Sequence, residues 1–132
     1  MGWLEREAAY SRGEVSGEFF EALVRLLVEP WQPFISAGRH RCSLCRFSGG
    51  PAQFTHGEHT VLVGVSNVFV PGNGVIYVAP SLVVHYIDAH GYRPPDGFIE
   101  AVLGCPPMGT MPYLRALKAI DGGALLRRRH GP

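Results

Sequence analysis

The sequence predicts an α+β domain, in which a small antiparallel hairpin packs with about four helices. Apolar residues recur at helical spacing in several separate stretches, and valine-rich stretches flank one strong turn signal. The chain has 132 residues, of which 46% are hydrophobic. That length and composition are enough to bury a real core. We therefore expect residues 1–132 to form a single domain.

The first predicted helix covers residues 17–28. Phe19 and Leu23 belong to an apolar face with helical spacing, and Ser16 precedes them as a suitable N-cap. Pro30 cannot continue the helix, so the helix is expected to end before it. The regular apolar face predicts core packing and gives no indication of a functional site.

The predicted strands follow an irregular stretch that covers residues 31–60. Residues 60–70 are rich in valine and aromatic side chains, which is typical of a strand. Residues 71–74 read Pro-Gly-Asn-Gly, a strong turn signal, and residues 75–79 are a suitable partner strand. The pattern predicts one antiparallel hairpin.

Three more helices are expected in the second half of the chain. The first starts at Pro80-Ser81, and Gly91 ends it after His90. The second opens at Pro94-Pro95 and is ended by Gly104, and the third lies near residues 112–120. Residues 120–132 have no such pattern and are expected to be a flexible tail.

Two cysteines and two histidines predict a zinc knuckle. Cys42 and Cys45 form a C-x-x-C motif, whose spacing lets two thiolates face one ion from a tight turn. His85 and His90 have a separation found in structural zinc sites. Two thiolate charges cancel the charge of the dication, which favours a partly buried site. These four residues are the predicted ligands of a structural Zn²⁺ ion.

The helix that carries the histidines sets a condition on this prediction. Residues five apart on an ideal helix are displaced by about 140° around its axis. His85 and His90 therefore converge on one ion only if the helix ends or changes its pitch at His90. Gly91 directly follows and permits such an ending.

Other ligands and other meanings of the C-x-x-C remain open. Cys105 precedes a proline at a helix end and would replace a histidine in a Cys3His site. His56 and His59 form an H-x-x-H pair that also competes. A redox pair requires a helix directly after the motif, which the Gly-Gly-Pro at residues 49–51 disfavours. The cysteines would otherwise be small core residues without a ligand.

Charge, cysteine count and hydropathy narrow the class of protein. A formal net charge of +1 does not favour nucleic acids or membrane surfaces. Three cysteines are an odd number, which argues against a fully paired disulfide framework. No apolar stretch approaches the ~20 residues that a membrane span needs, and the acidic start does not resemble a secretion signal. We expect a cytoplasmic protein.

These patterns favour a zinc-stabilised domain that is not an enzyme and that binds another macromolecule. The expected partner is a protein. Arginines around the cysteines make a nucleic-acid-binding accessory protein the alternative (residues 39, 41 and 46). A metal-dependent hydrolase comes third. It would use Glu58 as a base within the H-x-x-H pair, but the order of residues differs from H-E-x-x-H.

One stretch of the sequence resembles a known family. Residues 85–95 read HYIDAHGYRPP, and Phe98-Ile99 and Cys105-Pro106 follow. Together with an upstream C-x-x-C, this signature is similar to a family of small bacterial proteins of unknown function. The resemblance covers roughly residues 40–117. It implies no activity, supports the choice of ligands and keeps Cys105 as a substitute.

Overall fold

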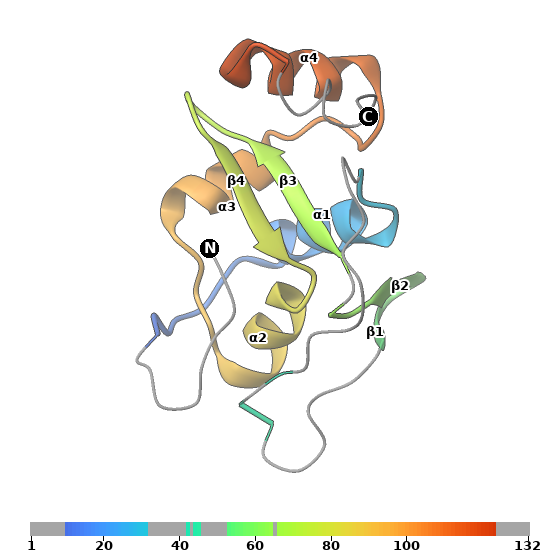
Figure 1. Ribbon diagram of the computed structural model, residues 1–132. Helices are drawn as coiled ribbons and strands as arrows, with labels where there is room; N and C mark the ends of the chain where they lie inside the picture. Colours follow the sequence, from blue (N-terminus) through green and yellow to red (C-terminus); the bar gives the residue numbers. More distant parts are fainter. Residues whose placement is uncertain (1–9, 32–41, 43, 46–52, 65, 124–132) are drawn as a thin grey trace.

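The computed structural model describes residues 10–31, 42, 44–45, 53–64 and 66–123 (Figure 1). In these ranges the chain forms four helices and two separate two-stranded antiparallel sheets. The predicted α+β class is confirmed. None of the helices in the described ranges has both the length and the hydropathy that crossing a membrane requires.

Helix α1 (Gly17–Val28) has the bounds that its sequence predicts. The Ser16 hydroxyl accepts a hydrogen bond from the Phe19 N–H at 3.1 Å, so the first turn has the expected N-cap. Phe19 and Leu23 are fully buried in the core, as the apolar face of the helix indicates. A solvent-exposed ion pair joins Arg25 to Glu21 on the opposite side.

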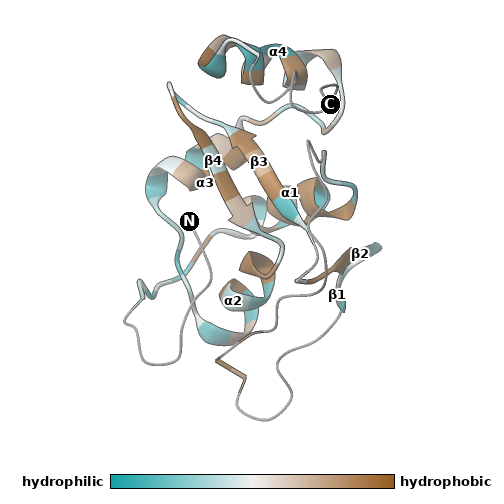
Figure 2. Cartoon of the chain, in the orientation of Figure 1, coloured by the Kyte–Doolittle hydropathy of each residue, from teal (hydrophilic) through white to brown (hydrophobic). Residues whose placement is uncertain are grey.

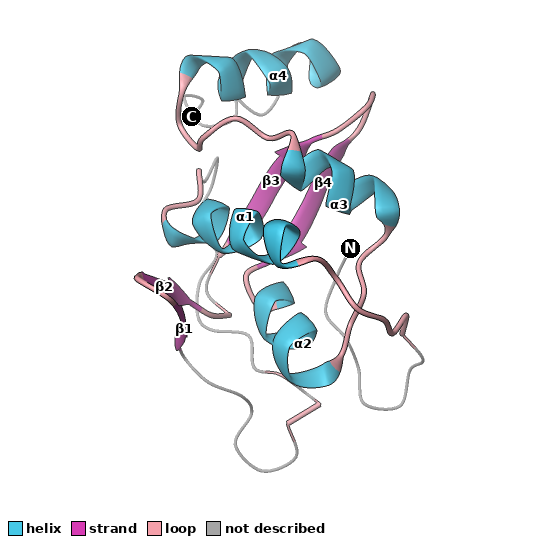
Figure 3. Cartoon of the chain, turned by 180° about the vertical axis from the view of Figure 1, so that it is seen from behind, coloured by secondary structure: helices cyan, strands magenta, loops and turns pink. Residues whose placement is uncertain are grey.

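Strands β3 (Asn67–Pro71) and β4 (Ile76–Pro80) form the predicted hairpin. Phe69 lies opposite Val78 in the register. The Gly72 N–H donates to the Val75 carbonyl at 2.8 Å and closes the turn. Helices α1 and α3 (Asp96–Leu103) cover one face of this hairpin (Figures 1 and 3).

A second hairpin corrects two expectations from the sequence. Strands β1 (Gln53–His56) and β2 (His59–Leu62) pair with each other, so residues 53–59 are not irregular. Residues 60–70 are not one strand, because they contain part of β2 and part of β3, which belong to different sheets. Gly64, with φ of +86°, lies between the two strands and redirects the chain.

Helix α2 (Val83–His90) is fixed at its beginning by buried hydrogen bonds. The Ser81 hydroxyl accepts from the Gly64 N–H at 2.9 Å. The Ser81 N–H donates to the Ser66 carbonyl, also at 2.9 Å. Figure 2 shows that the helix is hydrophobic at its start and more hydrophilic at its end. The start of α2 therefore belongs to the core, and its end lies near the surface.

Helix α4 (Met111–Asp121) packs on the end of the β3–β4 hairpin that is away from α2 (Figure 1). The Tyr113 hydroxyl donates to the Phe69 carbonyl at 2.6 Å, and the Trp31 ring contacts both aromatic rings edge-on. The helix includes the first residues of the predicted tail. Residues 124–132 of that tail lie outside the described residues.

Candidate metal centre

The two cysteines lie on one tight turn that rests against the core. The Cys45 N–H donates to the Cys42 carbonyl at 3.4 Å, so the backbone reverses direction between them. Cys42 is only 1% exposed and belongs to the main hydrophobic cluster, whereas Cys45 is half-buried. The turn thus holds both sulfurs on the side that faces α2.

The two histidines come from one helix and converge at its end. His85 is buried, with 6% of its surface exposed, and His90 is the last residue of α2. Their rings lie with centroids 5.0 Å apart at an angle of 85°. Side chains on a helix lean toward its N-terminus, so the His90 imidazole reaches back toward His85.

Gly91 ends the helix in the way that the convergence requires. It has φ of +65° and ψ of 22°, in the left-handed region. Its N–H donates to the carbonyl of Tyr86, five residues back, and the Tyr92 N–H donates to the same carbonyl at 3.2 Å. No further helical turn follows His90, so its imidazole is free to turn toward His85.

The distances between sulfur and nitrogen atoms are close to the edges of a zinc tetrahedron. Cys45 Sγ lies 3.1 Å from His85 Nε2 and 3.4 Å from His90 Nε2. Cys42 Sγ lies 3.5 Å from His90 Nε2. With usual Zn–S and Zn–N bond lengths and tetrahedral angles, each such edge is about 3.6 Å. All four candidate donor atoms lie within 4.8 Å of one another.

Hydrogen bonds alone do not account for this arrangement. His90 Nε2 lies within 3.5 Å of two sulfur atoms, Cys42 Sγ and Cys45 Sγ. An imidazole nitrogen has a single in-plane N–H or lone pair and therefore one well-directed partner. Two sulfurs at similar distances from one nitrogen are instead expected where three donors surround a common ion.

The electrostatics of the cluster also suit a bound cation. Burial lowers the pKa of His85, and the neighbouring His90 lowers it further. Burial also lowers the pKa of His90, with a second contribution from Arg12. Both imidazoles are thus held neutral, as metal ligands must be. Burial and, next, the adjacent Cys42 raise the pKa of the Cys45 thiol, so its thiolate is unfavourable without a cation. A dication between the two sulfurs would stabilise the thiolate.

Cys105 does not join the cluster. Its thiol donates to the carbonyl of the adjacent Pro106 at 3.3 Å, and the half-buried side chain packs against both hydrophobic clusters. Burial raises its pKa to about 11, which opposes formation of a thiolate ligand. The group of possible metal donors found in the described residues contains no Cys105.

The H-x-x-H pair also lies apart from the cysteines. His56 and His59 face each other across the β1–β2 turn, where Gly57 has φ of +60°. The His56 ring contacts Phe20 edge-on, with centroids 5.1 Å apart. The group of possible donors in the described ranges includes neither histidine. The predicted redox alternative depends on residues 46–52, which lie outside the described residues.

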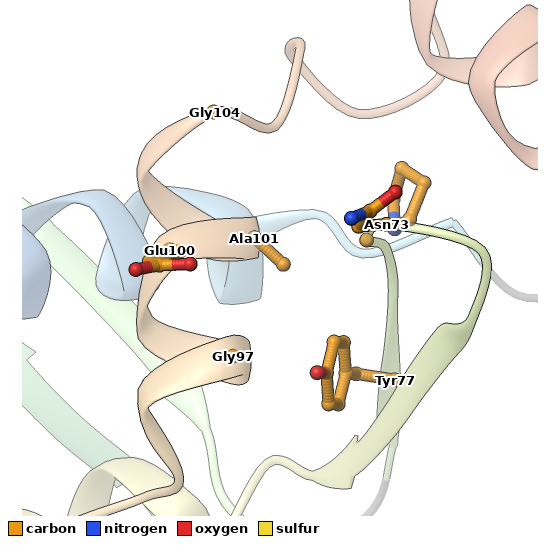
Figure 4. Close-up of a pocket in the computed structure, with 8 residues that line it drawn as sticks. Asn73, Tyr77, Gly97, Glu100, Ala101 and Gly104 are labelled. Carbon is orange, nitrogen blue, oxygen red and sulfur yellow. The ribbon is translucent and has the colours of Figure 1, made fainter.

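A hollow near α3 has no connection with the cluster. It has a volume of about 370 Å³ and lies between the β3–β4 turn and α3 (Figure 4). The ring of Tyr77 stands between the two elements, and Asn73 and Ala101 lie above it in this view. The lining of the hollow contains none of the four clustered cysteines and histidines. This hollow therefore gives no support to chemistry at the cluster.

The chain belongs to a family described as a domain of unknown function (DUF7919), whose model matches residues 1–103. The matched range contains all four clustered side chains and ends at the last residue of α3. No curated protein and no solved structure matches the chain. Membership confirms the expectation of a family without an assigned function.

Proposed function

We propose that this chain is a zinc-binding domain, in which Cys42, Cys45, His85 and His90 hold one structural Zn²⁺ ion. The observation that carries the proposal is the set of sulfur–nitrogen distances of 3.1, 3.4 and 3.5 Å, which resemble tetrahedral edges. Two thiolates and two imidazoles are a donor set that zinc prefers, and together they give a neutral site.

A structural role is favoured over a catalytic one, because four protein ligands complete the tetrahedron. Catalytic zinc keeps one position open for water or substrate. Here the ion would tie the turn at Cys42 and Cys45 to the end of α2. Structural zinc sites have apparent binding free energies of about 10–16 kcal/mol at neutral pH, which contribute directly to folding.

The test is elemental analysis of the purified protein combined with ligand variants. We expect close to one zinc ion per chain, and loss of zinc in Cys42→Ser and His90→Ala. Both variants should melt at least about 10 °C lower, since the loss of several kcal/mol shifts Tm by roughly 4 °C per kcal/mol. Cys105→Ser and His59→Ala are the matched controls and should retain zinc. Zinc-free native protein, or zinc retained in both ligand variants, would refute the proposal.

We further propose that the domain binds another protein. Apolar side chains are exposed on β2, at the β3–β4 turn and at the start of α4, with Leu62 58% and Met111 59% exposed. The net charge of +1 gives little attraction for a polyanion. The arginines that suggest nucleic-acid binding lie outside the described residues. The third candidate, a hydrolase, would need the H-x-x-H pair, which lies apart from the cluster.

Two measurements separate a protein partner from nucleic acid. Fluorescence anisotropy with single- and double-stranded oligonucleotides at low ionic strength should show no binding. Affinity capture with native protein should retain a defined partner, and Cys42→Ser should lose it. Oligonucleotide binding that weakens steeply with added salt would instead establish the nucleic-acid alternative.

A further inference from the structure

A segment far away in sequence crosses the end of α2. Residues 10–14, here called the N-terminal strap, run beside the chain that leaves this helix (Figures 1 and 3). The Gly13 N–H donates to the Gly91 carbonyl at 3.1 Å. The Arg93 N–H donates to the Ser11 carbonyl at 2.9 Å. The strap is thus bonded to the two residues on either side of Tyr92.

One side chain of the strap reaches a proposed zinc ligand directly. The Tyr10 hydroxyl donates to the backbone carbonyl of His90 at 3.0 Å. The guanidinium of Arg12 lies over the Tyr10 ring, 4.8 Å from its centroid. The ring also contacts Tyr92, with centroids 6.3 Å apart. These contacts fix the ring that carries the hydroxyl.

A second anchor holds the far end of the strap. The Arg93 guanidinium donates to the Glu14 carbonyl at 2.8 Å and forms an ion pair with Asp96 at 2.6 Å. Hydrogen bonds therefore join the strap to the last residue of α2 and to the residues directly after it. The strap residues that make these bonds are Tyr10, Ser11, Gly13 and Glu14.

The end of α2 needs such support more than its beginning. The last carbonyls of a helix have no partner within the helix, and terminal turns fray. His90 occupies that last position, yet its imidazole must stay within about half an ångström of its place to ligate an ion. Support of the His90 backbone therefore acts on the affinity for the metal.

We propose that the N-terminal strap is a positioning element of the metal centre, with Tyr10 as the residue that holds His90 in its ligating position. This inference rests on the proposed zinc site. Because linkage is reciprocal, a strap that strengthens zinc binding is itself held down more tightly by bound zinc. Metal loss therefore weakens the contact between the strap and α2 by the same factor.

The first test is the zinc affinity of Tyr10→Phe, measured by competition with a chromophoric chelator. The variant keeps the ring and loses only the hydroxyl, so its Kd should rise by about two- to tenfold, the range of one ordinary hydrogen bond. The matched control is Tyr113→Phe, which loses a hydrogen bond of 2.6 Å in the other cluster. A general loss of stability would weaken zinc binding in both variants, whereas a positioning effect appears only in Tyr10→Phe.

A spectroscopic readout and a proteolytic readout complete the test. Co²⁺-substituted Tyr10→Phe should show altered ligand-field bands, because His90 is less well placed, while Co²⁺-substituted Tyr113→Phe matches native protein. With zinc bound to both proteins, trypsin should cleave after Arg12 faster in Tyr10→Phe than in native protein. Cleavage after Lys118 in α4 is the internal reference.

The outcomes separate this inference from the zinc proposal on which it rests. Native protein without zinc would remove the zinc proposal itself. The other outcome is that native protein binds zinc tightly and that Tyr10→Phe has the same Kd, Co²⁺ spectrum and rate of cleavage after Arg12. That result would overturn only the role of the strap.

Discussion

At the residue scale, the cluster is defined by what each donor atom can do once it is buried. Cys42 is almost completely enclosed by the core, and His85 is enclosed nearly as well. A buried thiol and a buried imidazole each lose solvation when they carry charge, so burial alone favours their neutral forms. A bound dication reverses this preference for the thiols and leaves the imidazoles neutral. The same four side chains therefore have complementary roles around one ion.

Cys105 provides a prediction that separates ligand cysteines from a core cysteine. With zinc bound, iodoacetamide at pH 8 should modify none of the three thiols rapidly. After chelation the turn that carries Cys42 and Cys45 is no longer tied to α2, so both thiols should become accessible and be alkylated. Cys105 should still react slowly, because a pKa of about 11 leaves roughly one part in a thousand as thiolate. Its rate should rise about tenfold per pH unit up to that pKa. Peptide mass spectrometry measures each site, and fast labelling of Cys105 at pH 8 would contradict the assignment.

Sequence spacing was sufficient to predict which of these residues gather, but not what supports them. The C-x-x-C and the helical histidines are local patterns, each visible within six residues of sequence. The hydrogen bond from Tyr10 to His90 joins residues separated by 80 positions, and a tyrosine hydroxyl has no motif of its own. Only the fold brings that hydroxyl to the end of α2.

At the element scale, the end of α2 determines whether the site can form. The left-handed conformation at Gly91 stops the helix directly after His90. Sequence predicted this ending, because glycine after a histidine in the last turn is a common helix stop. Sequence did not predict the break between β2 and β3. Valines continue across Gly64, and only the pairing of each strand in its own hairpin reveals that the chain changes direction there.

Two glycines with nearly the same conformation test the helix end. Gly91→Ala places a side chain at φ of +65°, and Gly57→Ala does so at +60° in the β1–β2 turn. Nothing lies within 4 Å of the added Cβ at either position. Both variants should lose about 1 kcal/mol of stability, measured by urea unfolding in excess zinc. Only Gly91→Ala should also bind zinc more weakly, since the strain there displaces His90. Equal zinc affinity in the two variants would show that the helix end is unimportant for the site.

At the scale of the whole molecule, the metal centre and the aromatic cluster at α4 lie at opposite ends of the β3–β4 hairpin (Figure 1). The buried side chains form one cluster at each end, and the half-buried Cys105 and Met108 pack against both clusters. If residues 1–132 form a single domain, as the sequence predicts, removal of zinc at one end lowers the stability of the other end as well.

Chelation should therefore shift one cooperative transition. Trp31 reports on the cluster near α4, and far-ultraviolet circular dichroism reports on all the helices. The chain has a second tryptophan, Trp3, so Trp3→Phe leaves Trp31 as the tryptophan that is observed. In this background both signals should show the same melting midpoint, and excess EDTA should lower both midpoints equally. The decrease in both midpoints should become smaller as zinc is added back, in proportion to the logarithm of the free zinc concentration relative to Kd. Two separate transitions, with only one sensitive to EDTA, would divide the chain into independent units.

The central claim is a closed zinc site with two sulfur and two nitrogen ligands. X-ray absorption at the zinc edge of purified native protein tests it most directly, because the fine structure counts ligands and measures their distances. We predict two sulfurs at about 2.3 Å and two imidazole nitrogens at about 2.0–2.1 Å, with no other ligand. A bound water oxygen, or a shell with one or three sulfurs, would contradict the assignment of Cys42, Cys45, His85 and His90.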